Sequence, residues 1–225
     1  MDSMYETLMR MPLFAGVSRQ RMSEIIGKYK FHFLKFNPGE KIVTAGDVCT
    51  HLKSVIAGNV RVTVESHDKR FNISQTLSAP DLIAPEFFFG KTTAYPASVE
   101  AIDSAGILQF DKTDFLSIIN SDPIFLLNYL NILSVNAQRS TEGVLALTSG
   151  SLEKRIAYWI VALTQTNGKD IVLQCRQRDM YTVFGVPRQS LISALDRMTQ
   201  AGIITYTARE IEVLDRRALT SILSR

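Results

Sequence analysis

A long, uninterrupted helical pattern in the second half of the chain constrains the fold more than any other feature. Asp122-Pro123 suits a helix start, and from there to Thr148 the chain has no further proline and a single glycine, Gly143. Within this stretch small and apolar residues recur at alternating spacings of four and three, the a/d pattern of two helices packed along a seam. The stripe consists of Leu126, Leu130, Leu133, Ala137, Ser140, Val144 and Leu147.

This helix has two interpretations. A helix that packs only on its own domain needs no partner, whereas a heptad seam predicts a second copy of the chain. About 25 residues at ~1.5 Å each extend about 38 Å, which is longer than one small barrel covers. The length therefore favours a dimerisation helix, with Ala137 and Ser140 making the seam thin in its middle.

Residues 31–111 instead have the sequence texture of a β domain. Short runs rich in branched and aromatic residues alternate with turn sequences in which glycine, asparagine and aspartate tolerate a positive φ. Strands that recur about every ten residues favour an antiparallel barrel or sandwich over a βαβ sheet. The expected strands are residues 31–36, 52–56, 60–64 and 107–110, and the turns are NPG at 37–39, AGD at 45–47, AGN at 57–59 and SHDK at 66–69.

The last third of the chain has the order of elements found in a winged helix-turn-helix. Ser151 suits the N-cap of an amphipathic helix, SLEKRIAYWIVAL, and Asp215 suits the cap of a last helix. Gly185 suits the turn between two shorter helices, because that turn requires a positive φ. The elements expected between these caps are a strand at 171–173, helices at 178–184 and 188–201, and strands at 203–206 and 211–214 around a tight turn at Ala208-Arg209.

The helix at 188–201 has the residues of a DNA-reading helix. Leu191, Leu195 and Met198 form an inward stripe, while another face offers Arg, Gln and Ser side chains. Arginine bridges guanine O6 and N7, and glutamine bridges adenine N6 and N7. An ordinary amphipathic helix looks similar in isolation, but the hairpin, the helix spacing and the upstream dimer helix favour DNA binding. The candidate DNA-binding residues are Arg188, Gln189, Ser193, Arg197, Arg178 and Arg209.

Net charge is distributed unevenly along the chain. Residues 151–225 carry 11 Lys and Arg against 7 Asp and Glu, a net charge of +4, whereas residues 1–150 carry 14 against 15, a net charge of −1. A basic module attached to a neutral one indicates a polyanionic partner. The expected partner is double-stranded DNA with a palindromic operator, and RNA polymerase is a further candidate.

Five segments carry a family resemblance, in the order MPLFAGVS, FNPGEKIVTAGD, VIAGNVRV, SLEKRIAYWIVAL and GVPRQSLISALDRMTQAGII. Through them the chain resembles the CRP/FNR superfamily of bacterial transcription regulators over essentially its whole length. The resemblance implies an α+β fold with an N-terminal cyclic-nucleotide-binding-like β-roll (a double-stranded jelly roll), a long dimerisation helix and a C-terminal winged helix-turn-helix. The corresponding domains are an effector or sensor domain at residues 1–121, the dimerisation helix and hinge at 122–148, and the DNA-binding domain at 149–225.

Four positions depart from that family's pattern. The usual specificity positions carry an acidic residue and often an arginine where this chain has Gln189 and Ser193, so its operator should differ from the family consensus. Tyr181 replaces the small residue that usually lies four before the turn glycine and allows close helix packing. Pro187 replaces the usual Ser or Thr cap, and proline is tolerated at a helix start.

The segment PEFFFGKTTAYPASVEA at 85–101 corresponds to the family's cyclic-nucleotide cassette. In the cyclic-nucleotide branch this cassette contains a Gly-Glu pair and then an Arg followed by Ser or Thr, which hold the phosphate. Here Pro85-Glu86 and Tyr95-Pro96 stand at those places, and a buried phosphate without a cationic partner is costly. Cyclic AMP or GMP is therefore a disfavoured effector. The candidate effector-pocket residues are Glu86, Phe87, Phe88, Phe89, Tyr95 and Ser98.

Cysteine usage limits the cofactors. The chain has two cysteines, Cys49 and Cys175, and none within residues 1–40, where the iron–sulfur branch of the family carries several, so such a cluster is excluded. Three alternatives remain: haem, an apolar or amphipathic ligand held against the aromatic residues, and a pocket that has lost ligand control. Candidate haem ligands are His32, His51, His67, Cys49, Met4, Met9, Met11 and Met22.

Composition and patterning favour a cytoplasmic, non-enzymatic protein. Apolar residues make up 46% and charged residues 21% of the chain, and no window approaches the ~18 uncharged apolar residues of a membrane helix. Asp2, Glu6 and Arg10 interrupt the apolar run that a signal peptide needs. The sequence shows no Ser/His/Asp set, phosphate-binding glycine loop or metal-spaced carboxylate pair. The alternative from another class is a non-enzymatic cyclic-nucleotide-binding-like scaffold without operator selectivity.

Overall fold

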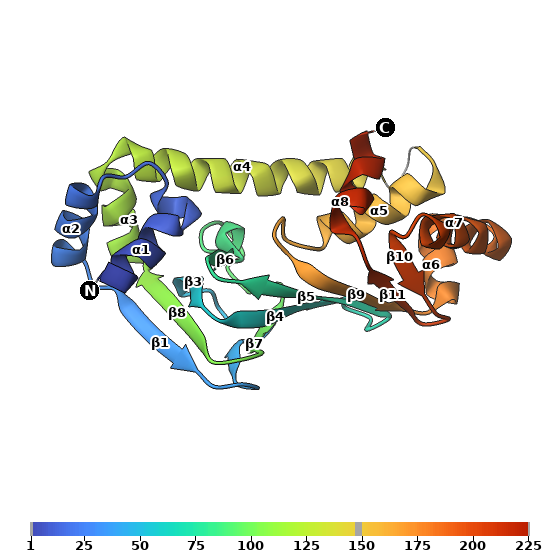
Figure 1. Ribbon diagram of the computed structural model, residues 1–225, viewed down its shortest axis with the longest axis horizontal. Coiled ribbons are helices and arrows are strands. Elements are labelled where there is room, and N and C mark those ends of the chain that lie inside the picture. The colour runs from blue at the N-terminus through green and yellow to red at the C-terminus, as the bar shows by residue number, and fades with distance from the viewer. Residues whose placement is uncertain (1, 147–149, 225) are drawn as a thin grey trace. The chain divides into compact units, whose positions relative to one another are not determined.

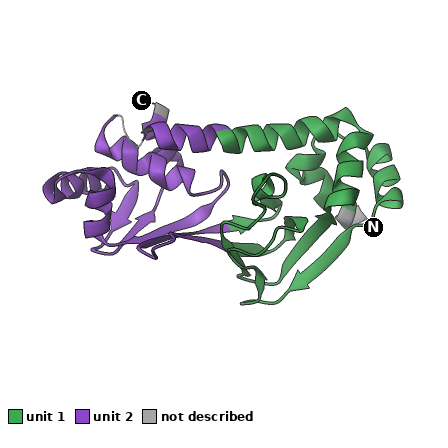
Figure 2. Cartoon of the chain, turned by 180° about the vertical axis from the view of Figure 1, so that it is seen from behind, with its two compact units in different colours: residues 1–61, 77–137 green, residues 62–76, 138–225 purple. Residues whose placement is uncertain are grey.

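Residues 2–146 and 150–224 are described by the structure, which is a computed structural model (Figure 1). Contacts divide the chain into two compact units, coloured green and purple in Figure 2. Unit 1 comprises residues 1–61 and 77–137, and unit 2 comprises residues 62–76 and 138–225. Residues 62–76 thus group with the C-terminal part of the chain. The domain boundaries expected after residues 121 and 148 remain predictions, and the second lies outside the described residues.

Unit 1 contains the predicted β-roll. One of its sheets has the antiparallel strand order β1-β8-β3-β6. These strands are His32–Phe36, Ala105–Asp111, His51–Ala57 and Asp81–Ile83. A second pair is formed by β2, Lys41–Val43, and β7, Ser98–Ala101. The strands expected at 31–36, 52–56 and 107–110 are confirmed to within two residues at each end.

The turn expected at 57–59 is built around a glycine that has no room for a side chain. Gly58 has a φ of +75°, and a Cβ on it would lie 2.5 Å from the carbonyl oxygen of Ser104. The next residue, Asn59, donates its backbone N–H to Asp103 Oδ1 at 2.8 Å. The close approach at Gly58 and the hydrogen bond from Asn59 both involve the loop between β7 and β8. The turn and this loop therefore stabilise each other.

Unit 1 also contains five helical segments that were not expected from the sequence: α1 (Asp2–Arg10), η1 (Pro12–Phe14), α2 (Arg19–Lys28), η2 (Pro85–Phe87) and α3 (Lys112–Ser121). Two of them begin at side-chain caps, because Ser18 Oγ accepts a hydrogen bond from the N–H of Arg21 and Asp111 Oδ1 accepts one from the N–H of Asp114. The cap signals were therefore present in the sequence.

Unit 2 contains the predicted C-terminal sheet together with a hairpin from earlier in the chain. Its strands follow the order β10-β11-β9-β5-β4. The first three are Ile204–Tyr206, Glu210–Val213 and Lys169–Cys175, and β4 (Asn59–Glu65) and β5 (Phe71–Ser78) belong to unit 2 through residues 62–76. The strand expected at 60–64 is confirmed as β4, whereas β5 was not expected.

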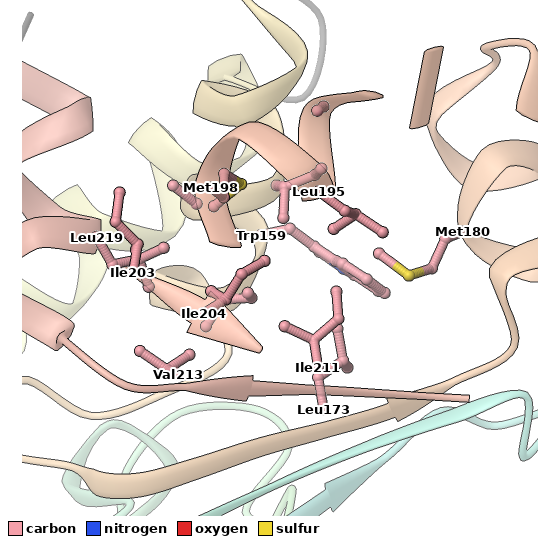
Figure 3. Close-up of a cluster of buried hydrophobic side chains, with 14 of the residues drawn as sticks. Trp159, Leu173, Met180, Leu195, Met198, Ile203, Ile204, Ile211, Val213 and Leu219 are labelled. Carbon is pink, nitrogen blue, oxygen red and sulfur yellow. The ribbon is translucent and has the colours of Figure 1, made fainter. Parts of the chain in front are cut away.

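The helices of unit 2 cover this sheet. They are α5 (Leu152–Ala162), α6 (Gln177–Phe184), α7 (Arg188–Gln200), α8 (Arg216–Ser221) and the short η3 (Ile222–Ser224). Figure 3 shows the core between them: Trp159 of α5 lies among side chains from the sheet and from the helix-turn-helix. Ile160, Leu195 and Ile204 have no exposed surface. Ser151 and Asp215 cap α5 and α8 as expected.

The long helix is α4, Pro123–Ala146. It begins where expected, and Asp122 Oδ1 accepts a hydrogen bond from the N–H of Ile124 at 2.9 Å. Its lone glycine has a packing reason, because a Cβ on Gly143 would lie 2.5 Å from the Cβ of Ala162 in α5. In the described part of the chain no single helix is long and apolar enough to cross a membrane; α3 and α4 meet that test only as a pair bent by 117°.

Candidate nucleic-acid interface

The turn between α6 and α7 has the geometry that the sequence predicted. Gly185 ends α6 with a φ of 62°, a left-handed conformation that costs glycine little. The N–H of Gly185 donates to the carbonyl oxygen of Thr182 and the N–H of Val186 donates to that of Tyr181. After this turn Pro187 occupies the cap position of α7 without a side-chain hydrogen bond. The two helices are therefore joined by a short connection that two backbone hydrogen bonds hold to the end of α6.

The buried face of α7 determines which residues it presents outward. Leu191 and Leu195 have no exposed surface, and Met198 is 1% exposed, so the predicted inward stripe is confirmed. Arg188 and Gln189, at the start of the helix, are exposed. Ser193 is partly buried and its side chain is short, so it reaches less far from the helix surface than Arg188 and Gln189 do.

Arg197 of α7 is engaged by a carboxylate of α5. Its Nε and Nη2 lie 2.6 and 2.5 Å from Glu153 Oε1, and the side chains of Arg197 and Glu153 are 60% and 18% exposed. Burial raises the pKa of Glu153, but hydrogen bonds from its own N–H, from Arg197 and from Ser151 outweigh burial and leave the pKa below its usual value. The ion pair fixes α7 on α5, a role for Arg197 that the sequence did not predict.

The neighbouring helix α6 carries one more predicted DNA-binding residue and one of the departures from the family pattern. Arg178 is exposed on α6. Tyr181, which stands at the position where the family has a small residue, is partly buried and packs against the rim of the core shown in Figure 3. A tyrosine is accommodated here because its ring adds to the edge of the core.

The wing is the hairpin of β10 and β11, and Arg209 lies exposed in its turn. The turn is closed by the N–H of Thr207, which donates to the carbonyl oxygen of Glu210 at 2.8 Å. The carbonyl oxygen of Ala208 accepts from the N–H of Gln177, the first residue of α6, at 3.2 Å. The wing turn and the start of α6 therefore lie side by side.

A shallow depression of about 430 Å³ lies on unit 2 beside this wing turn. Its lining includes four basic side chains, those of Lys69, Arg70, Arg176 and Arg209, and one acidic side chain, that of Glu210. Of these the sequence had pointed only to Arg209. Arg176 is the residue before α6 and could have been found from its place next to the predicted helix, whereas Lys69 and Arg70 are distant in sequence and looked like part of an ordinary turn.

Comparison with known proteins matches both halves of the chain. The family model of the cyclic nucleotide-binding domain matches residues 33–122, and that of the Crp-like helix-turn-helix domain matches residues 154–222. The chain belongs to the CRP/FNR superfamily of transcription regulators. As a member of that superfamily it is a DNA-binding transcription regulator with a domain of the cyclic-nucleotide-binding type.

Solved structures show the same CRP/FNR-type fold. The catabolite activator protein of Thermus thermophilus is 16% identical with a TM-score of 0.50, and the match covers 95% of this chain and 98% of that one. A mutant of CooA from Carboxydothermus hydrogenoformans is 20% identical with a TM-score of 0.51, and 92% of each chain is covered. Among curated proteins no relative matches. At these identities the likeness shows the fold alone.

In this CRP/FNR-family chain the cassette of the β-roll is packed with aromatic rings. Phe88 has no exposed surface, and its ring centroid lies 4.7 Å from that of Phe89 and 5.6 Å from that of Phe115. Tyr129 of α4 packs its ring against Phe115 at 4.9 Å and donates its hydroxyl to the carbonyl oxygen of Pro85 at 3.0 Å. Phe87 is partly buried. These rings belong to the core of unit 1.

The polar residues of the cassette form hydrogen bonds with other residues of the chain. Glu86 is exposed and accepts from Asn136 Nδ2 of α4 at 2.9 Å. Tyr95 is 4% exposed and donates its hydroxyl to the carbonyl oxygen of His51 at 3.1 Å, while Ser98 Oγ accepts from the N–H of Ala45. Burial, with the neighbouring Cys49, raises the pKa of Tyr95. The pocket formed by these residues stays a prediction.

The candidate haem ligands differ in burial and in their hydrogen-bond partners. His32 and His67 are exposed, and Met9 is partly buried. His51 Nδ1 is 2.8 Å from Thr50 Oγ1. Cys49, Met11 and Met22 are at most 1% exposed, and the side chain of Met4 lies outside the described part of the structure. Within the described residues, no group of three or more His, Cys, Asp and Glu side chains is arranged to hold a metal ion.

Proposed function

We propose that this regulator is a homodimer that reads a two-fold symmetric operator through α7 and that its β-roll responds to an effector other than a cyclic nucleotide. The observation that carries the proposal is the division of α7 into two faces. Leu191 and Leu195 are fully buried, and this burial leaves Arg188 and Gln189 exposed in the first turn of the helix. In helix-turn-helix proteins it is the N-terminal part of the second helix that contacts base edges.

The chemistry of these side chains defines the roles we propose. Arg188 would donate two hydrogen bonds to guanine O6 and N7, and Gln189 would pair with adenine N6 and N7. Arg178 on α6 and Arg209 on the wing would contact backbone phosphates, which position the protein without selecting a sequence. Ser193 would lie at the edge of the base-reading surface of α7, because its side chain is short and partly buried.

Dimerisation through α4 is supported by apolar side chains that its own chain leaves exposed. Leu126, Leu130 and Val144 of the predicted stripe are 38%, 47% and 68% exposed. Ala137 and Ser140 are exposed as well, Leu133 is partly buried, and Leu147 lies outside the described residues. A parallel pair of α4 helices would bury this stripe and relate two copies of α7 by a two-fold axis. The operator would then contain two half-sites about 10 bp apart.

The effector is proposed to lack a phosphate. No arginine is present in the cassette, and the hydroxyl of Tyr95 is bonded to the carbonyl oxygen of His51 within the protein. An apolar or amphipathic ligand is favoured by the aromatic composition of the cassette, and haem is the second candidate. An absorption spectrum of the freshly purified protein separates the two, since a Soret band would establish haem. Titration with cyclic AMP is expected to give no binding heat.

Selection from random DNA with the purified protein tests the whole proposal. We expect an enriched palindrome, bound in the nanomolar range and with strong salt dependence, as is usual for specific protein–DNA interfaces. Absence of any enriched palindrome would favour a scaffold without operator selectivity and would contradict the proposal. Because the partner is DNA, we place the protein in the cytoplasm, with RNA polymerase as a second macromolecular partner.

A further inference from the structure

The hairpin of β4 and β5 is joined to the DNA-binding unit by a regular strand ladder. β5 pairs antiparallel with β9, with Phe71 opposite Cys175, Asn72 opposite Gln174 and Ile73 opposite Leu173. β9 in turn pairs with the wing strand β11. Figure 1 shows the tip of this hairpin beside β9 and β11. The sheet that carries the wing is therefore extended by two strands from the first half of the sequence.

Side chains of β5 anchor the hairpin in the core of unit 2. Ile73 is 1% exposed within the core cluster, and the ring of Phe71 packs edge-on against Trp159 at 5.0 Å. Gln75 is 3% exposed, and its Oε1 accepts from the N–H of Gln165 at 2.8 Å. A Cβ at Gly168 would lie 2.0 Å from the same oxygen, so a larger residue there would displace the Gln75 side chain. The hairpin therefore packs as an integral part of unit 2.

The turn at residues 66–70, at the tip of the hairpin, is held in one conformation. Ser66 Oγ accepts from the N–H groups of Arg70 and Phe71 and donates to Asp68 Oδ1 at 2.8 Å. Lys69 has a φ of 56°, and Arg70 Nε lies 3.1 Å from Asp68 Oδ2 on an open surface. An exposed ion pair of this kind contributes little and leaves the guanidinium available to a stronger partner.

This turn supplies half of the positive charge around the depression. Lys69 and Arg70 line it from the hairpin, and Arg176 and Arg209 line it from the start of α6 and from the wing turn. All four basic residues are exposed, and Glu210 is the one acidic residue among the lining residues. Asp68, which borders the site, offsets part of the charge. A net positive charge remains next to two elements that helix-turn-helix proteins place against DNA.

We propose that the 66–70 turn is an additional DNA-binding element, in which Lys69 and Arg70 contact backbone phosphates that flank the operator half-site. The inference rests on the proposed DNA-reading role of α7. Phosphate is the ligand chemistry because guanidinium groups bind it bidentately and the adjoining amides and hydroxyl, those of Asn72, Gln174 and Thr207, add neutral donors. We assign this phosphate to a DNA backbone because the depression is shallow and its basic side chains are exposed. This shape suits a nucleic-acid strand that lies across the surface.

The test compares the full-length protein with the variant K69Q/R70Q on the selected operator. Two duplexes are used: one ends at the selected half-sites, and the other continues into arbitrary flanking sequence on both sides. On the long duplex we expect the variant to bind at least tenfold more weakly. The slope of log K against log salt should fall by about four, because two phosphate contacts are lost at each of the two half-sites. On the short duplex both proteins should bind equally. A matched control, K28Q/K30Q, removes two exposed charges from unit 1 and should leave both duplexes unaffected.

The remaining outcomes are distinguishable. If the wild type selects an operator but K69Q/R70Q binds the long duplex normally, the inference is overturned and the proposed function stands. An equal loss on both duplexes would overturn it too, because the turn would then act by supporting the fold. A third outcome is that flank length has no effect on operator affinity, while inorganic phosphate at constant ionic strength binds to the wild type and not to K69Q/R70Q. The depression would then be a small-anion site, and the inference would be overturned. Failure of the wild type to select any operator would contradict the proposed function itself.

Discussion

The winged helix-turn-helix and the cassette of the β-roll dispose their chemically distinctive side chains in opposite ways. In α7 the apolar stripe is buried and Arg188 and Gln189 are left exposed. In the cassette Phe88 is buried among other rings and the hydroxyl of Tyr95 bonds to a carbonyl oxygen of the same unit. The first arrangement prepares polar groups for an external partner, whereas the second uses aromatic groups for internal packing. Residue type alone therefore does not distinguish a side chain that faces a ligand from one that packs in the core; the exposure and the hydrogen bonds of the side chain do.

Phe88→Ala should have the largest effect on stability of any substitution in these two regions. Because Phe88 has no exposed surface, its truncation should lower the free energy of unfolding by about 3–5 kcal/mol, the usual cost of removing a buried phenylalanine. Chemical denaturation measures this. Phe87→Ala, at a partly buried neighbour, should cost clearly less, and Phe88→Leu provides an intermediate step if the alanine variant does not fold. A stability unchanged by Phe88→Ala would mean that the ring lines a cavity, and the contrast with α7 would be lost.

Arg188→Ala should show the opposite behaviour. The side chain is exposed, so the free energy of unfolding should change by less than about 0.5 kcal/mol. Affinity for the selected operator should fall by about 1–3 kcal/mol, and the preference for the base pair that Arg188 reads should relax. Binding of operator variants, compared with Arg217→Ala as an exposed control on α8, measures both effects. If all sequences were weakened equally, Arg188 would be a phosphate contact and the reading face of α7 would be assigned wrongly.

Local signals in the sequence predicted much of this architecture. The positive φ of Gly185, the caps at Ser151 and Asp215, and the buried stripe of α7 depend on neighbours within a few residues, and the structure has each of them. The family resemblance then supplied the order of the parts, which the matches to the two family models confirm.

Interactions between distant residues could not be predicted in the same way. The pairing of β5 with β9 joins Asn72 to Gln174, and nothing in either strand alone specifies the other as its partner. The basic turn at residues 66–70 consequently read as an ordinary surface turn. The first two helices were missed even though Ser18 provides a cap, because their apolar residues face a core whose other side is built from later parts of the chain.

The ion pair between Arg197 and Glu153 gives a predicted DNA-binding residue a partner within its own unit. The pKa of Glu153 is lowered in the folded protein, so the pair stabilises the fold at pH values above the ordinary carboxyl pKa and loses that contribution as the pH falls through the lowered value. Because Arg197 is 60% exposed, Arg197→Ala should cost only about 0.5–1 kcal/mol near neutral pH. Denaturation curves for the wild type and the variant should therefore converge on acidification.

Glu153→Gln separates the two roles open to Arg197. It removes the carboxylate while leaving the arginine in place, so it should reproduce the stability loss of Arg197→Ala and its disappearance at low pH. If Arg197 acts only by holding α7 on α5, both variants should weaken operator binding to the same small extent. If Arg197 also reaches DNA, Arg197→Ala should bind more weakly than Glu153→Gln, which frees the guanidinium for a phosphate. Operator affinities of the two variants, measured at neutral pH, decide whether Arg197 only holds α7 on α5 or also contacts DNA.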